Sequence, residues 1–211
     1  MIKRNAPGYL GVIISLIVFL AIFLSMQYLD ADIAIRIFSI LQSFRGLHKA
    51  TENIPDFLPY IVITGSILMW VIYFYRLHKK KFGSKTQFLM LAATALPSAY
   101  LLKMFFQFVF GRTGTRQWLT VKSPLVFNWF NNLANGSFPS GHMTVFSAFG
   151  TAVLIYFPRY RKQILILLTI LGAALILTDY HFISDVIAGT YLGVITTYFL
   201  WVIIYKRRVK L

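Results

Sequence analysis

Three short polar segments interrupt a chain that otherwise consists largely of long apolar runs. The first begins at Lys103 and continues through residues 111–116, the second is residues 138–142, and the third is residues 179–185. They supply lysine, arginine, serine, histidine and aspartate, the side chains that bind anions or transfer protons. Ionisable residues are costly at membrane depth and are therefore candidates for function. Together the three segments predict one site that binds an anion and moves protons.

The third segment places a histidine and an aspartate four residues apart, as His181 and Asp185. On a helix this spacing puts both side chains on one face. A carboxylate there fixes the tautomer of the imidazole and raises its basicity, as in a catalytic triad. The alternative is a hydrogen bond that caps a helix. His142 is a second imidazole for proton transfer, although a single histidine at a helix end is more often a satisfied polar residue.

Cations and a helix start predict a phosphate site. Lys103, Arg112 and Arg116 are suited to an anionic phosphate. Ser140 and Gly141 follow a proline where a helix should begin, and the free N–H groups of a helix start bind anions. In isolation, Lys103 could extend to the membrane surface and the two arginines could contact lipid headgroups.

The sequence predicts neither a metal ion nor another cofactor. Magnesium and calcium sites need several oxygen ligands, and only Asp179 and Asp185 lie among the polar segments. A catalytic zinc ion needs three protein ligands, whereas the polar segments offer two histidines. The chain has no cysteine, which excludes disulfides and thiolate metal sites.

Six apolar runs must position these segments. Hydrophobic residues make up 58% of the 211 residues and charged residues only 13%, whereas a soluble domain carries about a quarter charged residues. The runs, the fourth interrupted by His142, are residues 8–29, 57–75, 86–102, 138–158, 163–178 and 186–205. Lipid cannot satisfy an open backbone, so each run should be a helix. The sequence predicts one domain, residues 1–211, that is an all-α integral membrane bundle of six transmembrane helices.

Basic residues are distributed unevenly between the segments that join the runs. Six spans place both termini on one side of the membrane, together with residues 76–85 and 159–162, and the first run is too long for a signal-peptide core. That side carries 14 of the 21 lysines and arginines, and the other side carries all six acidic residues. The positive-inside rule predicts cytoplasmic termini and a site on the periplasmic or extracellular face of the cell (inner) membrane. The clustering argues against a nucleic-acid partner despite the net charge of +15.

Two outer segments carry further patterns. Ile33, Ile37 and Ile40 recur at helical spacing within residues 30–56, which predicts an amphipathic helix lying in the membrane interface, with an irregular loop as the alternative. Aromatic residues between the third and fourth runs should anchor at the interface, or could line an entrance for a lipid chain. These aromatic residues are Trp118, Phe127, Trp129 and Phe130.

The motifs resemble those of the type 2 phosphatidic-acid phosphatase superfamily, a family of membrane lipid phosphate phosphatases. The resemblance extends from about Lys103 to Gly193, and the six-span layout fits the whole chain. Residues 139–142, Pro-Ser-Gly-His, match the second family motif completely. His181 and Asp185 match the end of the third motif.

The chain departs from the family pattern at two arginines. Eight residues separate Lys103 from Arg112, and the Arg-Pro of the first motif is missing. Leu175 stands where the third motif has its arginine. We therefore predict that one of Arg112 and Arg116 fills the first-motif role and that the other replaces the third-motif arginine. Both guanidinium groups should then point at the space between Ser140 and His181.

The resemblance implies a role for each site residue. His181 would attack phosphorus to form a phosphohistidine, Asp185 would orient it, and His142 would protonate the leaving lipid oxygen. Lys103, an arginine and Ser140 would hold phosphate oxygens. The implied substrate is a lipid phosphate in the bilayer: an isoprenyl pyrophosphate, phosphatidate or phosphatidylglycerol phosphate, or a lipid A type. Alternatives are a phosphotransferase that uses the same phosphohistidine with a lipid acceptor, and an inactive lipid-binding relative.

Overall fold

The computed structural model of the chain describes residues 8–43, 57–121, 125–131 and 136–208. Across these residues the regular structure is helical, and only an isolated bridge between Arg112 and Phe127 has β-type pairing. The elements are α1 (Gly8–Tyr28), α2 (Asp30–Ser43), α4 (Leu58–His78), α5 (Ser84–Phe110), α6 (Thr115–Val121), α7 (Gly141–Tyr156), the 3-10 helix η1 (Pro158–Tyr160), α8 (Arg161–Leu177) and α9 (Ile183–Arg208).

Five of the described helices, α1, α4, α5, α8 and α9, are long and apolar enough to cross a membrane. Their outer faces carry many exposed leucine, isoleucine and phenylalanine side chains, as lipid contact requires. The prediction of an all-α membrane protein is therefore confirmed. The prediction of six spans is met only in part, because α7 has 16 residues and falls short of the others.

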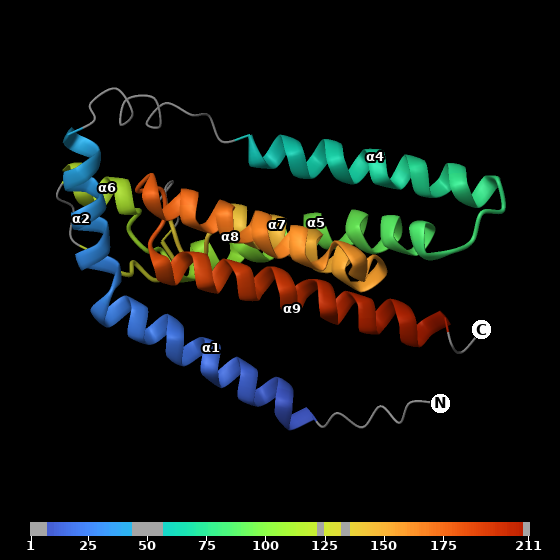
Figure 1. Cartoon of the computed structure of the whole chain (residues 1–211), viewed down its shortest axis with the longest axis horizontal. Helices are drawn as coiled ribbons and strands as arrows, with labels where there is room; N and C mark the ends of the chain where they lie inside the picture. The colour runs from blue at the N-terminus through green and yellow to red at the C-terminus, as the bar shows by residue number, and fades with distance from the viewer. Residues whose placement is uncertain (1–7, 44–56, 122–124, 132–135, 209–211) are drawn as a thin grey trace.

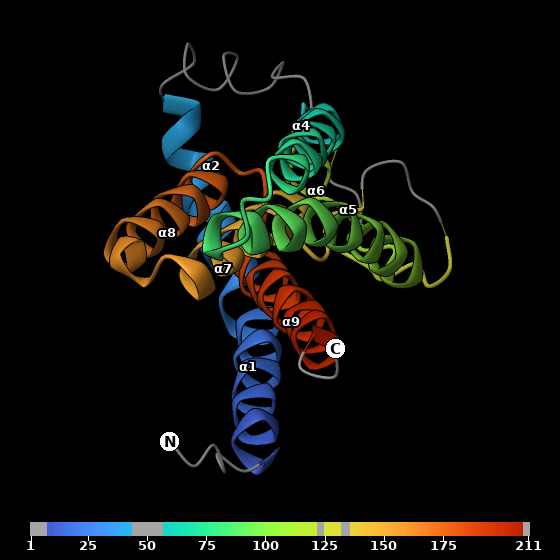
Figure 2. The same ribbon diagram turned by 90° about the vertical axis from the view of Figure 1, so that its right-hand side faces the viewer.

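The short helix α7 lies at the centre of the bundle, where it contacts α5, α8 and α9 (Figure 2). Nine of its residues are buried. At 1.5 Å per residue it is about 24 Å long, less than the roughly 30 Å of a hydrocarbon core. A helix surrounded by protein need not match the thickness of the bilayer, which accounts for its length.

Glycines in α9 allow α7 and α9 to pack closely. A Cβ atom on Gly193 would lie 2.2 Å from the carbonyl oxygen of Thr144, and one on Gly189 would lie 2.5 Å from that of Ser140. These two glycines are four residues apart, the small-residue spacing that lets membrane helices approach each other. The hydroxyl of Thr197 also donates to the carbonyl of Ala148 at 3.1 Å. The position of α7, including its first turn, is therefore fixed against α9.

Figure 1 shows α2 lying across one end of the long helices, beside α6 and the turn between α8 and α9. The start of α1 and the end of α9 lie at the opposite end. The prediction of a helix in residues 30–56 is confirmed for Asp30–Ser43, and residues 44–56 lie outside the described part of the chain. Asp30, Ala34 and Leu41 are its buried residues. Its position in the membrane interface stays a prediction.

Candidate active site

The start of α7 brings a lysine against a helix N-terminus. Ser140 is the N-cap, and its hydroxyl accepts a hydrogen bond from the backbone N–H of Met143 at 3.4 Å. A Cβ atom on Gly141 would lie 2.6 Å from Cε and 3.2 Å from Nζ of Lys103. Glycine therefore leaves the space that the lysine side chain occupies. The predicted neighbours Lys103, Ser140 and Gly141 lie together, and a cation beside a helix start is suited to an anion.

His181 and Asp185 face each other, as their spacing predicted, but not along a helix. Asp185 lies in the first turn of α9, whereas His181 lies in the turn that precedes Ile183, the first residue of α9. Nδ1 of His181 lies 3.4 Å from Oδ2 of Asp185. This separation is long for a hydrogen bond, as is common in catalytic pairs without substrate. Because Nδ1 faces the carboxylate, Nε2 is the ring nitrogen left for chemistry.

Tyr180 connects the two histidines. Its ring centroid lies 5.5 Å from that of His142 and 5.2 Å from that of His181, and both pairs meet edge to face. His142 is half-buried in the first turn of α7, while His181 is buried. The structure thus brings the two predicted histidines to one site. Apart from its position next to His181, Tyr180 has no feature that would single it out from sequence.

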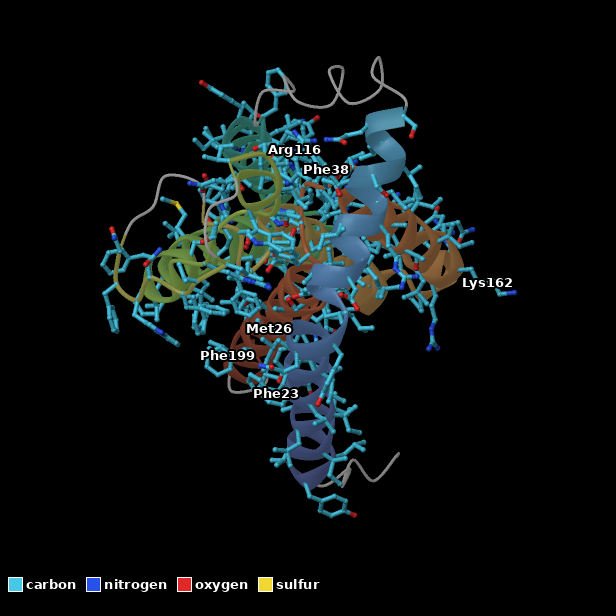
Figure 3. The ribbon with its side chains drawn as sticks, turned by 90° about the vertical axis from the view of Figure 1, so that its left-hand side faces the viewer. Phe23, Met26, Phe38, Arg116, Lys162 and Phe199 are labelled. Atoms are coloured by element: carbon cyan, nitrogen blue, oxygen red, sulfur yellow. The ribbon has the colours of Figure 1, made fainter. Side chains whose placement is uncertain are left out.

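Arg116 approaches this site from α6. Its Nη2 donates to the backbone carbonyl of Thr178 at 2.9 Å, and its guanidinium lies 5.0 Å from the centroid of the Tyr180 ring. Figure 3 shows Arg116 at the end of the molecule where α2 and α6 adjoin. Arg116 therefore lies at the edge of the histidine site and contacts the turn that carries His181.

Arg112 has protein carboxylates as its partners. The side chain is fully buried, at 1% exposure. Its Nη1 donates to Oδ1 of Asp185 at 2.6 Å and to the hydroxyl of Ser184 at 2.7 Å, and its Nη2 donates to Oδ2 of Asp30 at 2.7 Å. The expected orientation toward the space between Ser140 and His181 is corrected here, because both terminal nitrogens are directed at carboxylates. Arginine binds carboxylates and phosphates through the same geometry, so its type could not predict the partner.

Asp30 and Ser184 are part of this cluster, and sequence reasoning assigned them no role. Oδ1 of Asp30 accepts a hydrogen bond from the backbone N–H of Ser184 at 3.1 Å, and the Ser184 hydroxyl donates to Oδ2. The two residues are 154 positions apart, so no local pattern links them. The available signal was the pair of acidic residues in the first turn of α2, Asp30 and Asp32, which is also explained by the helix dipole.

Aromatic rings surround the buried arginine. The guanidinium carbon of Arg112 lies 4.4 Å from the ring centroid of Phe182 and 5.5 Å from that of Phe127. Phe127 therefore packs against the charged cluster, whereas Trp129 and Phe130 of the same loop are exposed. Their interfacial or lipid-entrance role stays a prediction.

Other predicted positions have simpler surroundings. Leu175, which replaces the third-motif arginine, is buried against Met143 and Val186 and supplies packing in place of charge.

Within the described residues, no group of three or more histidine, cysteine or acidic side chains could hold a metal ion. A small recess, partly open to solvent, adjoins His181 and is also lined by Asp30 and Asp179.

Comparison with known proteins identifies the family of this chain. The model of the PAP2 superfamily matches residues 88–209. The lipid A 1-phosphatases of Rhizobium etli and Rhizobium johnstonii are 44% identical over 57 residues, which cover 27% of this chain and 25% and 23% of theirs. The match thus spans about a quarter of the length of these relatives. A PAP2-type phosphatidylglycerolphosphate phosphatase structure from Bacillus subtilis aligns over 89% of this chain and 96% of its own, with 17% identity and a TM-score of 0.33. Because the family model covers more than half of the chain, this protein belongs to the PAP2 superfamily.

Proposed function

We propose that this protein hydrolyses a phosphomonoester or pyrophosphate carried by a membrane lipid. The observation that supports it most is the meeting of two elements at one end of the bundle: the His181–Asp185 pair and the Lys103 side chain at the start of α7. Membership of the PAP2 superfamily and the likeness to two lipid A 1-phosphatases support a phosphatase activity.

His181 is the proposed nucleophile. Nε2 attacks phosphorus while the bond from phosphorus to the lipid oxygen breaks, and His142 donates a proton to that oxygen. Asp185 keeps the proton on Nδ1 and stabilises the positive charge on the ring. Water then attacks the phosphohistidine, His142 accepts a proton from the water, and inorganic phosphate leaves with the nitrogen–phosphorus bond broken.

Phosphate oxygens are held, in this proposal, by Lys103, by Ser140 and Gly141 at the start of α7, and by Arg116 from the edge of the site. Phosphoryl transfer depends mainly on positioning and on stabilising charge that is spread over three oxygens. The chain provides a helix start and two cations for that purpose, and we expect turnover to persist in excess EDTA.

The substrate is proposed as a class of lipids. Lipid A 1-phosphate is one compound to test, because two similar proteins are lipid A 1-phosphatases. The others are an isoprenyl pyrophosphate, phosphatidate and phosphatidylglycerol phosphate. All of them could keep their apolar chains against the lipid-facing helices while the phosphate reaches the polar end of the bundle.

Phosphate release from these four lipids by purified protein in detergent tests the proposal, with His181→Ala as the paired variant. We expect release from at least one lipid by the wild-type protein and none by His181→Ala. Transfer of labelled phosphate to a second lipid would identify a phosphotransferase instead. No release and no transfer with any of the four lipids would contradict the proposal and favour an inactive relative.

We further propose that the site faces the non-cytoplasmic side, which the distribution of lysine and arginine supports. The chain contains no cysteine, so single cysteines can be introduced cleanly. Gly114→Cys should react with an impermeant thiol reagent added to intact cells, and Ser84→Cys only after the membrane is opened. The reverse pattern would contradict this orientation.

A further inference from the structure

The buried cluster around Arg112 connects the start of α2 with the start of α9. Arg112, Asp30, Ser184 and Asp185 are each at most 1% exposed. Arg112 bonds to both carboxylates, and Asp30 also accepts from the backbone N–H of Ser184, the residue before Asp185. The first turn of α2 and the first turn of α9 are therefore held as one unit by charged groups away from water.

The two oxygens of Asp185 have different partners. Oδ1 accepts from Arg112 at 2.6 Å. Oδ2 accepts from the backbone N–H of Phe182 at 3.2 Å and faces Nδ1 of His181 at 3.4 Å. Rotation of the carboxylate would break at least one of these contacts. Arg112 thus sets the orientation in which Asp185 meets the histidine.

The negative charge of Asp30 balances part of the positive charge of Arg112. One guanidinium lies between two carboxylates, so its positive charge is shared between Asp30 and Asp185. The negative charge of Asp30 offsets part of the positive potential that Arg112 produces at Asp185, so without it the net positive potential at Asp185 would be larger. A carboxylate that is paired more strongly with arginine is a weaker acceptor for the imidazole N–H. Asp30 therefore leaves Asp185 available to His181.

We propose that Asp30 and Arg112 are positioning residues that hold Asp185 in place for His181. Through Asp30, the first turn of α2 thus contributes to the orientation of the histidine. Neither touches the substrate in this scheme, and both act through Asp185. The proposal rests on the proposed function, because it assumes that His181 carries out the chemistry. It also separates the two arginines of the outer segment: Arg112 serves the histidine pair, and Arg116 is left to the phosphate.

Asp30→Asn is the first test, because it removes the charge and keeps the shape. A small displacement of a reacting group can cost about 100-fold in rate, so we expect kcat to fall between about 10- and 100-fold while KM changes less than about threefold. Asp32→Asn is the matched control, since Asp32 lies in the same first turn but is exposed. It should keep the wild-type kcat. A wild-type kcat in folded Asp30→Asn would overturn the proposal.

Arg112→Gln, alone and combined with Asp30→Asn, is the second test. The single variant leaves two buried carboxylates without a cation, and we expect a larger loss of kcat than in Asp30→Asn. The double variant removes both charges together, so its kcat should recover at least about tenfold over Arg112→Gln, yet stay below wild type. A rise in KM at unchanged kcat in Arg112→Gln would identify a phosphate ligand and overturn the proposal.

Folding is measured separately by size-exclusion chromatography, and kcat is expressed per folded protein. If Asp30→Asn does not fold, the double variant decides: reduced kcat in folded protein supports the proposal, and wild-type kcat or failure to fold contradicts it. Failure of the proposed function has a different signature, since the wild-type protein would then release phosphate from none of the four lipids.

Discussion

Helices α7 and α9 both begin at the candidate active site, but the charged side chains beside their N-termini have opposite signs. The first turn of α9 carries Asp185, and the N–H of Ser184 donates to a second carboxylate, Asp30. The first turn of α7 has no acidic residue, and its Gly141 lies against the side chain of Lys103. Both helix starts carry the same partial positive charge. At α9 the protein supplies the anions itself, whereas at α7 it adds a further cation.

This difference indicates how the two helix starts share the work. An N-terminus already bonded to protein carboxylates is a poor place for a phosphate, and it is well suited to hold a histidine in a fixed orientation. An N-terminus that is joined by a lysine attracts an anion. The α9 start thus fits the proposed nucleophile, and the α7 start fits the proposed phosphate site. Substitutions at the two starts should therefore have different kinetic effects.

Asp185→Asn should have the largest effect. The amide cannot stabilise a charged imidazole and favours the wrong tautomer, and the corresponding change in a serine protease triad lowers kcat about 10⁴-fold. We expect kcat to fall at least about 10³-fold with little change in KM, as measured by phosphate release at saturating substrate. A variant that retains a tenth of wild-type kcat would show that the α9 start does not orient the nucleophile.

Lys103→Met should act at the α7 start. Removing one charged contact to a phosphoryl transition state costs about 100-fold or more, and the effect should appear in kcat/KM. The matched control is Lys162→Met, because Lys162 is exposed and extends away from the bundle in Figure 3. Equal loss in both variants would point to the overall charge of the protein and not to the α7 start.

Arg116→Ala tests whether a second cation serves the α7 start. If its guanidinium binds phosphate oxygens, kcat/KM should fall about 100-fold. Arg36→Ala is the control, since Arg36 is an exposed arginine on neighbouring α2. Nearly full activity in Arg116→Ala would show that its contact with Thr178 is structural and that the site works with one fewer cation.

Gly189→Ala should disturb the distance between the two helix starts. Its Cβ atom would lie 2.5 Å from the carbonyl oxygen of Ser140, so α7 and α9 must separate. Overpacking of this kind typically costs about 1–3 kcal/mol, and we expect a lower melting temperature with a moderate loss of kcat. Gly11→Ala is the control, because a Cβ atom on Gly11 would meet no neighbouring element within 4 Å. Equal melting temperatures of Gly189→Ala and Gly11→Ala would contradict the close packing of α7 against α9.

Much of the architecture could be predicted because its causes are local. Long apolar runs predict helices in lipid, and amphipathic spacing predicts α2. The pairing of His181 with Asp185 followed from their spacing, although a helix start and not a helix face brings them together. The length of α7 was harder to predict, since it depends on burial by neighbouring helices and not on its own composition.

The partners of Arg112 could not be predicted for a different reason. Asp30 is 82 positions away and Asp185 is 73 positions away, so only the folded bundle brings them to the arginine. A single sequence contains no covariation that would reveal the pairing. Carboxylate and phosphate are also equivalent partners by chemistry. The assignment of an arginine to a ligand or to the protein is thus decided by tertiary structure.

The burial of Arg112 has a consequence for ionic strength. Mobile ions screen charges within a Debye length of about 10 Å at 0.1 M salt and about 3 Å at 1 M, but they screen buried pairs much less. Lys103 and Arg116 are only half-buried, whereas the ion pairs of Arg112 are closed to solvent. Added salt should therefore weaken the capture of an anionic lipid and leave the orientation of His181 unchanged. KM should then rise along a salt titration while kcat stays nearly constant. A salt titration would therefore distinguish the binding of the anionic lipid from the orientation of His181.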